Sequence, residues 1–128
     1  MNMRLLLAIL ITASFHLHAE EIQLTFSEAN KIWEKSKDRE DYQVYSTEFA
    51  QFSNHFRLDE KDGCYSLSEG SVELMLVITH IDGAEYAKIE NVLSNVDNPK
   101  SDCFKGTYHG IPTKVPPFFP FVLQMSME

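Results

Sequence analysis

The chain has 128 residues, 44% of them hydrophobic, which is enough for the core of one small domain. Acidic residues outnumber basic ones by 19 to 11, and the formal net charge is −8. A chain this acidic is a poor ligand for nucleic acids and for anionic lipid surfaces, because both attract basic proteins. We therefore expect no nucleic-acid partner.

The first 19 residues, MNMRLLLAILITASFHLHA, have the layout of a secretory signal peptide. Arg4 provides the positive start, and an apolar stretch from Leu5 to Phe15 precedes a cleavage site before Glu20. The apolar stretch is shorter than the roughly 20 residues that a membrane-spanning helix needs. A buried N-terminal helix is the alternative. We expect export to the periplasm or the exterior, a single mature domain of residues 20–128, and no membrane anchor after signal cleavage.

The two cysteines, Cys64 and Cys103, allow one intramolecular pairing. Exported proteins meet oxidising conditions, so we expect a disulfide between them. A zinc site that adds His80 and His109, or a reactive thiol activated by His109, is the alternative. No C-x-x-C or H-x-x-x-H spacing supports the zinc site, and no nucleophile signature surrounds either cysteine. We expect no metal and no cofactor.

The N-terminal part of the domain, residues 20–58, is predicted to be helical. Thr25 or Ser27 can cap a first helix, which the charged segment KSKDRED ends. Five aromatic residues then recur at steps of three and four: Tyr42, Tyr45, Phe49, Phe52 and Phe56. This spacing places them on one stripe of a second helix. The stripe is predicted to pack in the core, and a ligand-binding strip is the alternative.

The C-terminal part changes to the period of β-strands. Ser71 to Ile81 reads as a central strand, and Asp82-Gly83 predicts a tight hairpin with a return strand over residues 85–93. A short helix follows, with Asn98 or Asp97 as its cap, Pro99 at its first position and Gly110 beyond its end. The proline-rich segment 112–120 is predicted to be an extended linker. Phe121 to Met127 alternates as a last strand with one buried face.

This order of features resembles the C-terminal domain of TonB-type energy transducers, and is most similar to its two-cysteine variant in AgmX/PglI-like proteins. The resemblance covers residues 62–127. The residues that carry it are Cys64-Tyr65, Gly70, Val72, Asp82-Gly83, Cys103 and Pro116-Pro117. It implies an α-β-β-α-β unit in which two helices cover one face of a three-stranded antiparallel sheet. It also implies that the cysteines meet on those helices, and that a sheet edge accepts a partner strand. The membrane helix and long spacer of a transducer do not appear in the sequence, so energy coupling is not expected.

We therefore predict an α+β, non-catalytic module that binds an envelope or secreted protein. Asp82 and Gly83 at the hairpin tip, with Phe121, Leu123 and Met125 in the last strand, are its predicted contact residues. The alternatives are an inhibitor or immunity-type protein that binds a toxin, a small-ligand carrier that uses the aromatic stripe, and an enzyme. The candidate catalytic histidines for an enzyme are His55, His80 and His109, but no hydrolase, metalloprotease or phosphate-loop motif accompanies them.

Overall fold

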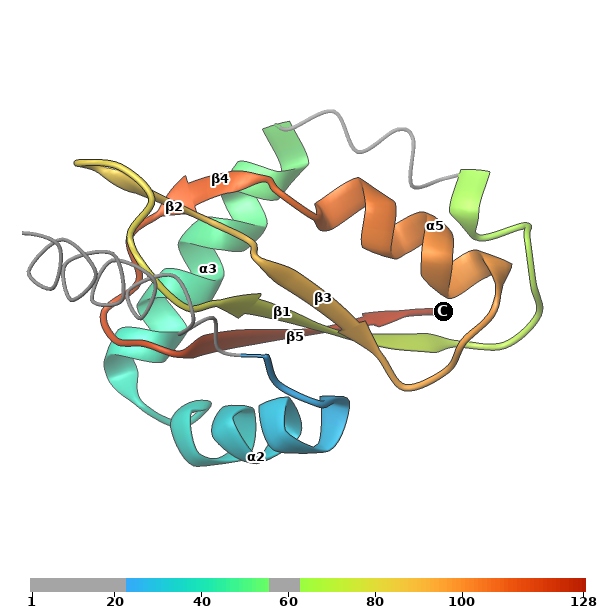
Figure 1. The fold of residues 1–128 in the computed structure, drawn as a ribbon, viewed down its shortest axis with the longest axis horizontal. Helices are drawn as coiled ribbons and strands as arrows, with labels where there is room; N and C mark the ends of the chain where they lie inside the picture. The colour runs from blue at the N-terminus through green and yellow to red at the C-terminus, as the bar shows by residue number, and fades with distance from the viewer. Residues whose placement is uncertain (1–22, 56–62) are drawn as a thin grey trace, which may run out of the picture.

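A computed structural model describes residues 23–55 and 63–128 (Figure 1). The expected signal peptide and Phe56 lie outside the described residues. The helices are α2 (Phe26–Ser36), α3 (Glu40–His55) and α5 (Pro99–Tyr108). The strands are β1 (Val72–Ile78), β2 (Tyr86–Lys88), β3 (Asn91–Ser94), β4 (Pro112–Lys114) and β5 (Phe121–Met127). None of the described helices is long and apolar enough to cross a membrane.

The main sheet is antiparallel, has three strands and has the order β3-β1-β5. The predicted α+β class, three-stranded antiparallel sheet and central position of β1 are therefore confirmed. The seven residues of β1 pair along their whole length with β5, from Val72 opposite Met127 to Ile78 opposite Phe121. Every residue of β1 except Glu73 is buried, as expected for a strand that is covered on both faces.

Helices cover both faces of the main sheet, with α5 on one side and α2 on the other (Figure 1). One face packs against α3 and α5, and its core includes Leu74, Leu76, Phe104, Phe121 and Leu123. The opposite face packs Met75, Val77 and Val122 against Ala29 of α2. The prediction that β5 buries only one face was wrong, because the sequence pattern did not reveal that α2 would cover Val122.

Helix α2 begins with a capping box. Thr25 accepts a hydrogen bond from the backbone N–H of Glu28, whose carboxylate accepts one from the N–H of Thr25. The hydrogen bonds from Thr25 lower the pKa of Glu28.

Helix α5 is bounded by the predicted residues. Asn98 caps it, Pro99 is its first residue, and Gly110 follows its end with a φ of +79°. In this conformation a residue other than glycine would be strained.

The return strand is not continuous as predicted. Its first part, β2, pairs with β4 in a separate two-stranded sheet, and its second part, β3, pairs with β1. Strand β4 begins at Pro112, inside the segment predicted to be a linker. A proline is tolerated there because it is the first residue of a strand at the edge of a small sheet.

The turn at Asp82-Gly83 is also wider than the predicted two-residue hairpin. The N–H groups of Asp82 and Gly83 both donate to the Tyr86 carbonyl, at 3.1 and 3.2 Å, and a bridge pairs Ile81 with Ala87. The φ of Gly83 is not positive, so the tight turn that Asp-Gly favours does not form.

The disulfide between Cys64 and Cys103 is present, as predicted, with its Cα atoms 5.5 Å apart. Cys64 is buried in the short helical stretch 63–64, and Cys103 lies on α5. Because both sulfur atoms are in this bond, neither can act as a thiolate ligand or as a nucleophile while the bond is intact.

The aromatic stripe of α3 packs mainly in the core. Tyr42, Tyr45 and Phe49 are buried, and the rings of Tyr42 and Tyr45 lie 5.0 and 4.6 Å from that of Phe121. Phe52, one turn further along, is 40% exposed. The core interpretation is therefore confirmed for the first three aromatic residues.

We expect the double substitution Cys64→Ala/Cys103→Ala to lower the free energy of unfolding by about 4 kcal/mol, since the bond closes a loop of 39 residues. Urea unfolding followed by circular dichroism measures this difference. The unsubstituted protein in reductant should lose a similar amount. Equal stability of oxidised and reduced protein would contradict a stabilising role for the bond.

Loss of the hydroxyl group should change the free energy of unfolding in opposite directions at two buried tyrosines. The Tyr45 hydroxyl donates to the Lys114 carbonyl at 2.6 Å, whereas the Tyr108 hydroxyl is buried without a hydrogen-bond partner among the described residues. Tyr45→Phe should therefore lower the free energy of unfolding by about 1 kcal/mol. Tyr108→Phe should cause no loss, and a gain of up to about 1 kcal/mol.

The alkaline behaviour of Tyr108→Phe provides a second measurement. Burial raises the pKa of Tyr108 to about 12, above the value of about 10 expected in the unfolded chain. The unfolded state therefore ionises first, and stability falls as the pH rises from 10 to 12. Tyr108→Phe should lose less stability than the unsubstituted protein over this range in urea titrations. An equal loss in the two proteins would show that ionisation of Tyr108 does not contribute to the loss of stability between pH 10 and 12.

Candidate functional site

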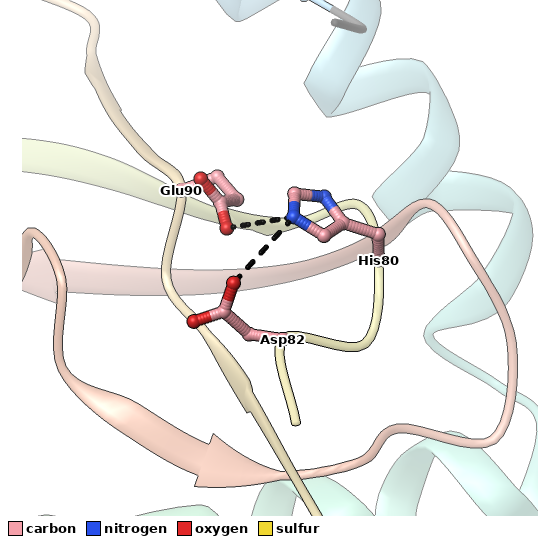
Figure 2. A group of neighbouring side chains, drawn as sticks. All are labelled: His80, Asp82 and Glu90. Carbon is pink, nitrogen blue, oxygen red and sulfur yellow. Dashed lines mark ion pairs between the residues drawn. The ribbon is translucent and has the colours of Figure 1, made fainter. Parts of the chain in front are cut away.

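Three side chains of the types that can ligate a metal converge beyond the end of β1. The Nε2 atom of His80 lies 3.3 Å from Oε1 of Glu90 and 3.9 Å from Oδ1 of Asp82 (Figure 2). One ligand atom from each residue falls within 4.8 Å of the other two. We refer to His80, Asp82 and Glu90 as the His-Asp-Glu cluster.

The backbone fixes two members of this cluster. The N–H of Glu90 donates to the Val77 carbonyl at 2.9 Å, which holds Glu90 beside the end of β1. The N–H of Asp82 donates to the Tyr86 carbonyl. His80 lies between Ile78, the last residue of β1, and the bridge at Ile81. Asp82 and Glu90 therefore start from hydrogen-bonded backbone positions on the two sides of the hairpin.

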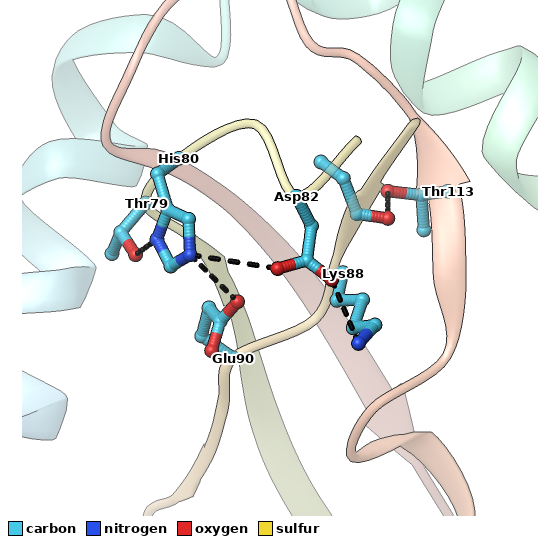
Figure 3. A network of polar contacts seen from close by, with 7 residues as sticks. Thr79, His80, Asp82, Lys88, Glu90 and Thr113 are labelled. Carbon is cyan, nitrogen blue, oxygen red and sulfur yellow. Dashed lines mark hydrogen bonds and ion pairs between the residues drawn. The ribbon is translucent and has the colours of Figure 1, made fainter. Parts of the chain in front are cut away.

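Two further polar residues contact the cluster. Nδ1 of His80 lies 3.0 Å from the Thr79 hydroxyl, and Nζ of Lys88 lies 2.7 Å from the second carboxylate oxygen of Asp82 (Figure 3). The hydrogen bond and the negative charge of Asp82 raise the pKa of Lys88. Asp82 thus presents one oxygen to Lys88 and the other to His80.

The sequence anticipated part of this site. It gave His80 as a candidate catalytic histidine, and it assigned Asp82, two residues later, to the contact surface at the hairpin tip. It missed Glu90 and Lys88, which belong to the return strand and reach the cluster only because the chain folds back. An acidic residue eight positions after Asp82, across a hairpin, is a signal that could have pointed to Glu90.

The hairpin tip also contains Gly83, which packs beside the ring of Tyr86. A Cβ atom at position 83 would overlap that ring, so the close approach requires glycine. Of the remaining histidines considered, His109 lies at the end of α5, away from the cluster residues in the sequence, and is exposed. The side chain of His55 lies outside the described part of the chain.

The predicted contact residues of the last strand have buried side chains. Phe121 and Leu123 are buried and Met125 is partly buried in the core. The side chains of Phe121 and Leu123 are therefore covered, and a partner strand would have to pair with the outer backbone edge of β5. Strand β5 lies at the edge of the main sheet, so its side away from β1 faces no other strand of the described residues.

The hydrogen bonds of β1 show which backbone groups of β5 face outward. The Val77 carbonyl and the backbone of Glu73 both bond toward the β3 side, to Glu90 and Asn95. Alternate residues of a strand bond in opposite directions, so the even-numbered residues of β1 bond toward β5. Their partners in β5 are odd-numbered. The backbone groups of Val122, Gln124 and Ser126 consequently point away from the sheet.

Part of this outer edge contacts α3. The Tyr42 hydroxyl forms a hydrogen bond with the backbone of Gln124. Burial raises the pKa of Tyr42, and this bond and one with Trp33 oppose the increase. The contact with α3 at Gln124 leaves Ser126, which is exposed, as the outward-facing residue nearest the end of the strand.

A groove of about 650 Å³ separates the second half of α3 from the β2–β4 sheet. Its apolar lining includes Tyr45, Phe49, Phe52, Tyr86 and Pro112. Phe52 and Tyr86 are large hydrophobic residues that are 40% and 42% exposed. The aromatic stripe therefore passes from the core into this groove.

Comparisons of the chain with protein-family models, curated proteins and solved structures found no match. The resemblance to TonB-type domains stays a prediction. The resemblance implies helices on one face of the sheet within residues 62–127, and α2, which covers the opposite face, lies outside that range.

Proposed function

We propose that this protein is an exported, non-catalytic module that binds another protein by adding a strand of its partner to β5. The observation that carries the proposal is the position of β5, a strand of seven residues at the edge of the main sheet. Backbone groups at such an edge can pair with an extended segment of another chain.

The arrangement of β5 favours backbone recognition over side-chain recognition. Its inward-facing side chains stabilise the core, while Ser126 is exposed and has its backbone groups directed outward. Main-chain hydrogen bonds would supply affinity, and side chains beside the strand would supply specificity.

The charge of the chain indicates which partner fits. A net charge of −8 accelerates association with basic proteins and disfavours acidic ones. We therefore propose a basic envelope or secreted protein as the partner, and an inhibitor or immunity-type role if that partner is a toxin. Export rests on the signal-peptide pattern of residues 1–19 and on the oxidised cysteine pair, which is typical of proteins outside the cytoplasm.

A substitution at Ser126 tests strand addition. Ser126→Pro removes an outward-facing N–H and leaves the β1 ladder intact, since the Ser126 backbone does not bond to β1. In capture experiments from the exported fraction of the source cells, it should reduce recovery of the partner at least tenfold. Ser126→Ala is the matched control, because it keeps the N–H, and it should bind normally.

Two measurements make this test decisive. Circular dichroism and urea unfolding should show that Ser126→Pro folds like Ser126→Ala. Amide hydrogen exchange in the captured complex should protect Ser126. Equal recovery of the partner by both variants, or absence of any reproducible partner, would rule out strand addition at β5.

The groove beside α3 favours carriage of a small apolar ligand as a second candidate function. Its volume lies within the range of about 300–1,000 Å³ typical of ligand pockets, and aromatic side chains line it. A carrier function would place the ligand against Phe52 and Tyr86 and would leave the edge of β5 unused.

The carrier function predicts that the neutral fluorophore N-phenyl-1-naphthylamine binds in this groove. Phe52→Asp should weaken binding at least tenfold, because it puts a charge in the apolar lining. Val44→Asp, on the same helix but outside the groove, is the control and should bind as well as the unsubstituted protein. Equal binding by the two variants, or no binding at all, would eliminate the carrier function.

A further inference from the structure

We propose that the His-Asp-Glu cluster binds one divalent transition-metal ion, with zinc as its representative. The proposal departs from the expectation of no metal, which rested on the absence of short ligand spacings in the sequence. One imidazole nitrogen and two carboxylate oxygens form a donor set that suits zinc and neighbouring first-row metals. The nitrogen donor disfavours calcium and magnesium, which prefer oxygen ligands.

The separations of the ligand atoms fit such an ion. Zinc bonds nitrogen and oxygen ligands at about 2.0–2.2 Å, which places tetrahedral ligand atoms roughly 3.3–3.6 Å apart. The distance from His80 Nε2 to Glu90 Oε1 is 3.3 Å, and that to Asp82 Oδ1 is 3.9 Å. The three ligand atoms all lie within 4.8 Å of one another, so the Asp82 carboxylate would move toward the other two ligand atoms on binding an ion.

Thr79 holds His80 in the orientation that metal binding requires. When Nδ1 of His80 donates its proton to the Thr79 hydroxyl, 3.0 Å away, Nε2 carries the lone pair and faces both carboxylates (Figure 3). Metal-bound histidines are commonly fixed by a hydrogen bond from their second ring nitrogen. Thr79 is therefore a positioning residue of the proposed site.

The charges in the cluster leave a cation favoured. With His80 neutral, the carboxylates of Asp82 and Glu90 and the ammonium group of Lys88 give one net negative charge. Lys88 bonds to the Asp82 oxygen directed away from His80, so the three converging ligand atoms stay available to an ion. The ammonium group nevertheless repels a second cation nearby, and its removal should strengthen metal binding.

The site is open to solvent on one side. The His80 side chain is 54% exposed, and those of Asp82 and Glu90 are 25% and 31% exposed. Three protein ligands with an open side leave a fourth position for water or another donor. An ion can therefore enter without any rearrangement of the core.

Calorimetric titration of the untagged protein with zinc chloride tests the proposal. We expect one ion per chain and a rise in the unfolding temperature with zinc, because binding to the folded state stabilises it. His80→Ala and Glu90→Gln should each weaken binding at least tenfold. His109→Ala is the matched control, because it removes a histidine outside the cluster, and it should bind normally.

Two more variants separate a metal site from a set of ion pairs. Thr79→Val should weaken binding about tenfold, as expected for loss of a residue that orients a ligand. Lys88→Gln should tighten binding severalfold, since it removes the opposing charge. A site that consisted only of ion pairs would bind no zinc in any of these proteins. Absence of zinc binding, or binding unaffected by His80→Ala, would overturn the proposal.

Discussion

The pairing of β1 with a neighbour on each side is the constraint on which the rest of the structure depends. Its odd-numbered residues bond toward β3 and its even-numbered residues bond toward β5. This register decides that Phe121 and Leu123 face the core beneath α3 and α5, and that Val122 faces α2. A shift of one residue would exchange the two faces of β5 and move Phe121 to the α2 side, away from the rings of Tyr42 and Tyr45 that it now contacts.

The disulfide acts on the same strand from outside the sheet. Cys64 precedes β1 and Cys103 follows β3, so the covalent loop encloses β1, β2 and β3. Closing this loop reduces the freedom of the unfolded chain in the segment that must form the hairpin. The disulfide and the aromatic packing of α3 thus both stabilise the fold, but they act on different states of the chain. The bond restricts the unfolded segment, and the buried tyrosines and Phe49 stabilise the folded sheet.

The sequence predicted the features that depend on local chemistry. The cap at Thr25, the cap at Asn98, the glycine after α5 and the central strand all follow from residue type and spacing over a few positions. The disulfide followed from the count of cysteines and the expected compartment. The position of one element relative to others that are distant in the sequence could not be predicted from such local patterns. The burial of Val122 depends on α2, about 90 residues earlier, and the break between Lys88 and Asn91 depends on pairing with β4.

The sequence revealed only part of the candidate site for the same reason, because contacts between distant residues could not be predicted. His80 and Asp82 are two residues apart, and their proximity needs no tertiary information. Glu90 joins them only because the return strand leaves β4 and begins to pair with β1 at that point, where its N–H bonds to Val77. Distant carboxylates of this kind escape motif searches, which depend on fixed short spacings.

The break in the return strand also gives the His-Asp-Glu cluster a structural context. Lys88 still pairs with β4, Asn91 already pairs with β1, and Glu90 lies between them. An ion held by Glu90 and by His80 would link this break to the segment that follows β1. The cluster follows Ile78, which is paired with Phe121, whereas Ser126 is paired with Glu73 near the other end of β1. The proposed metal site and the proposed strand-binding edge therefore lie at opposite ends of the main sheet. Because they share no residue and no hydrogen bond among the described contacts, the loss of one function leaves the other to be judged independently.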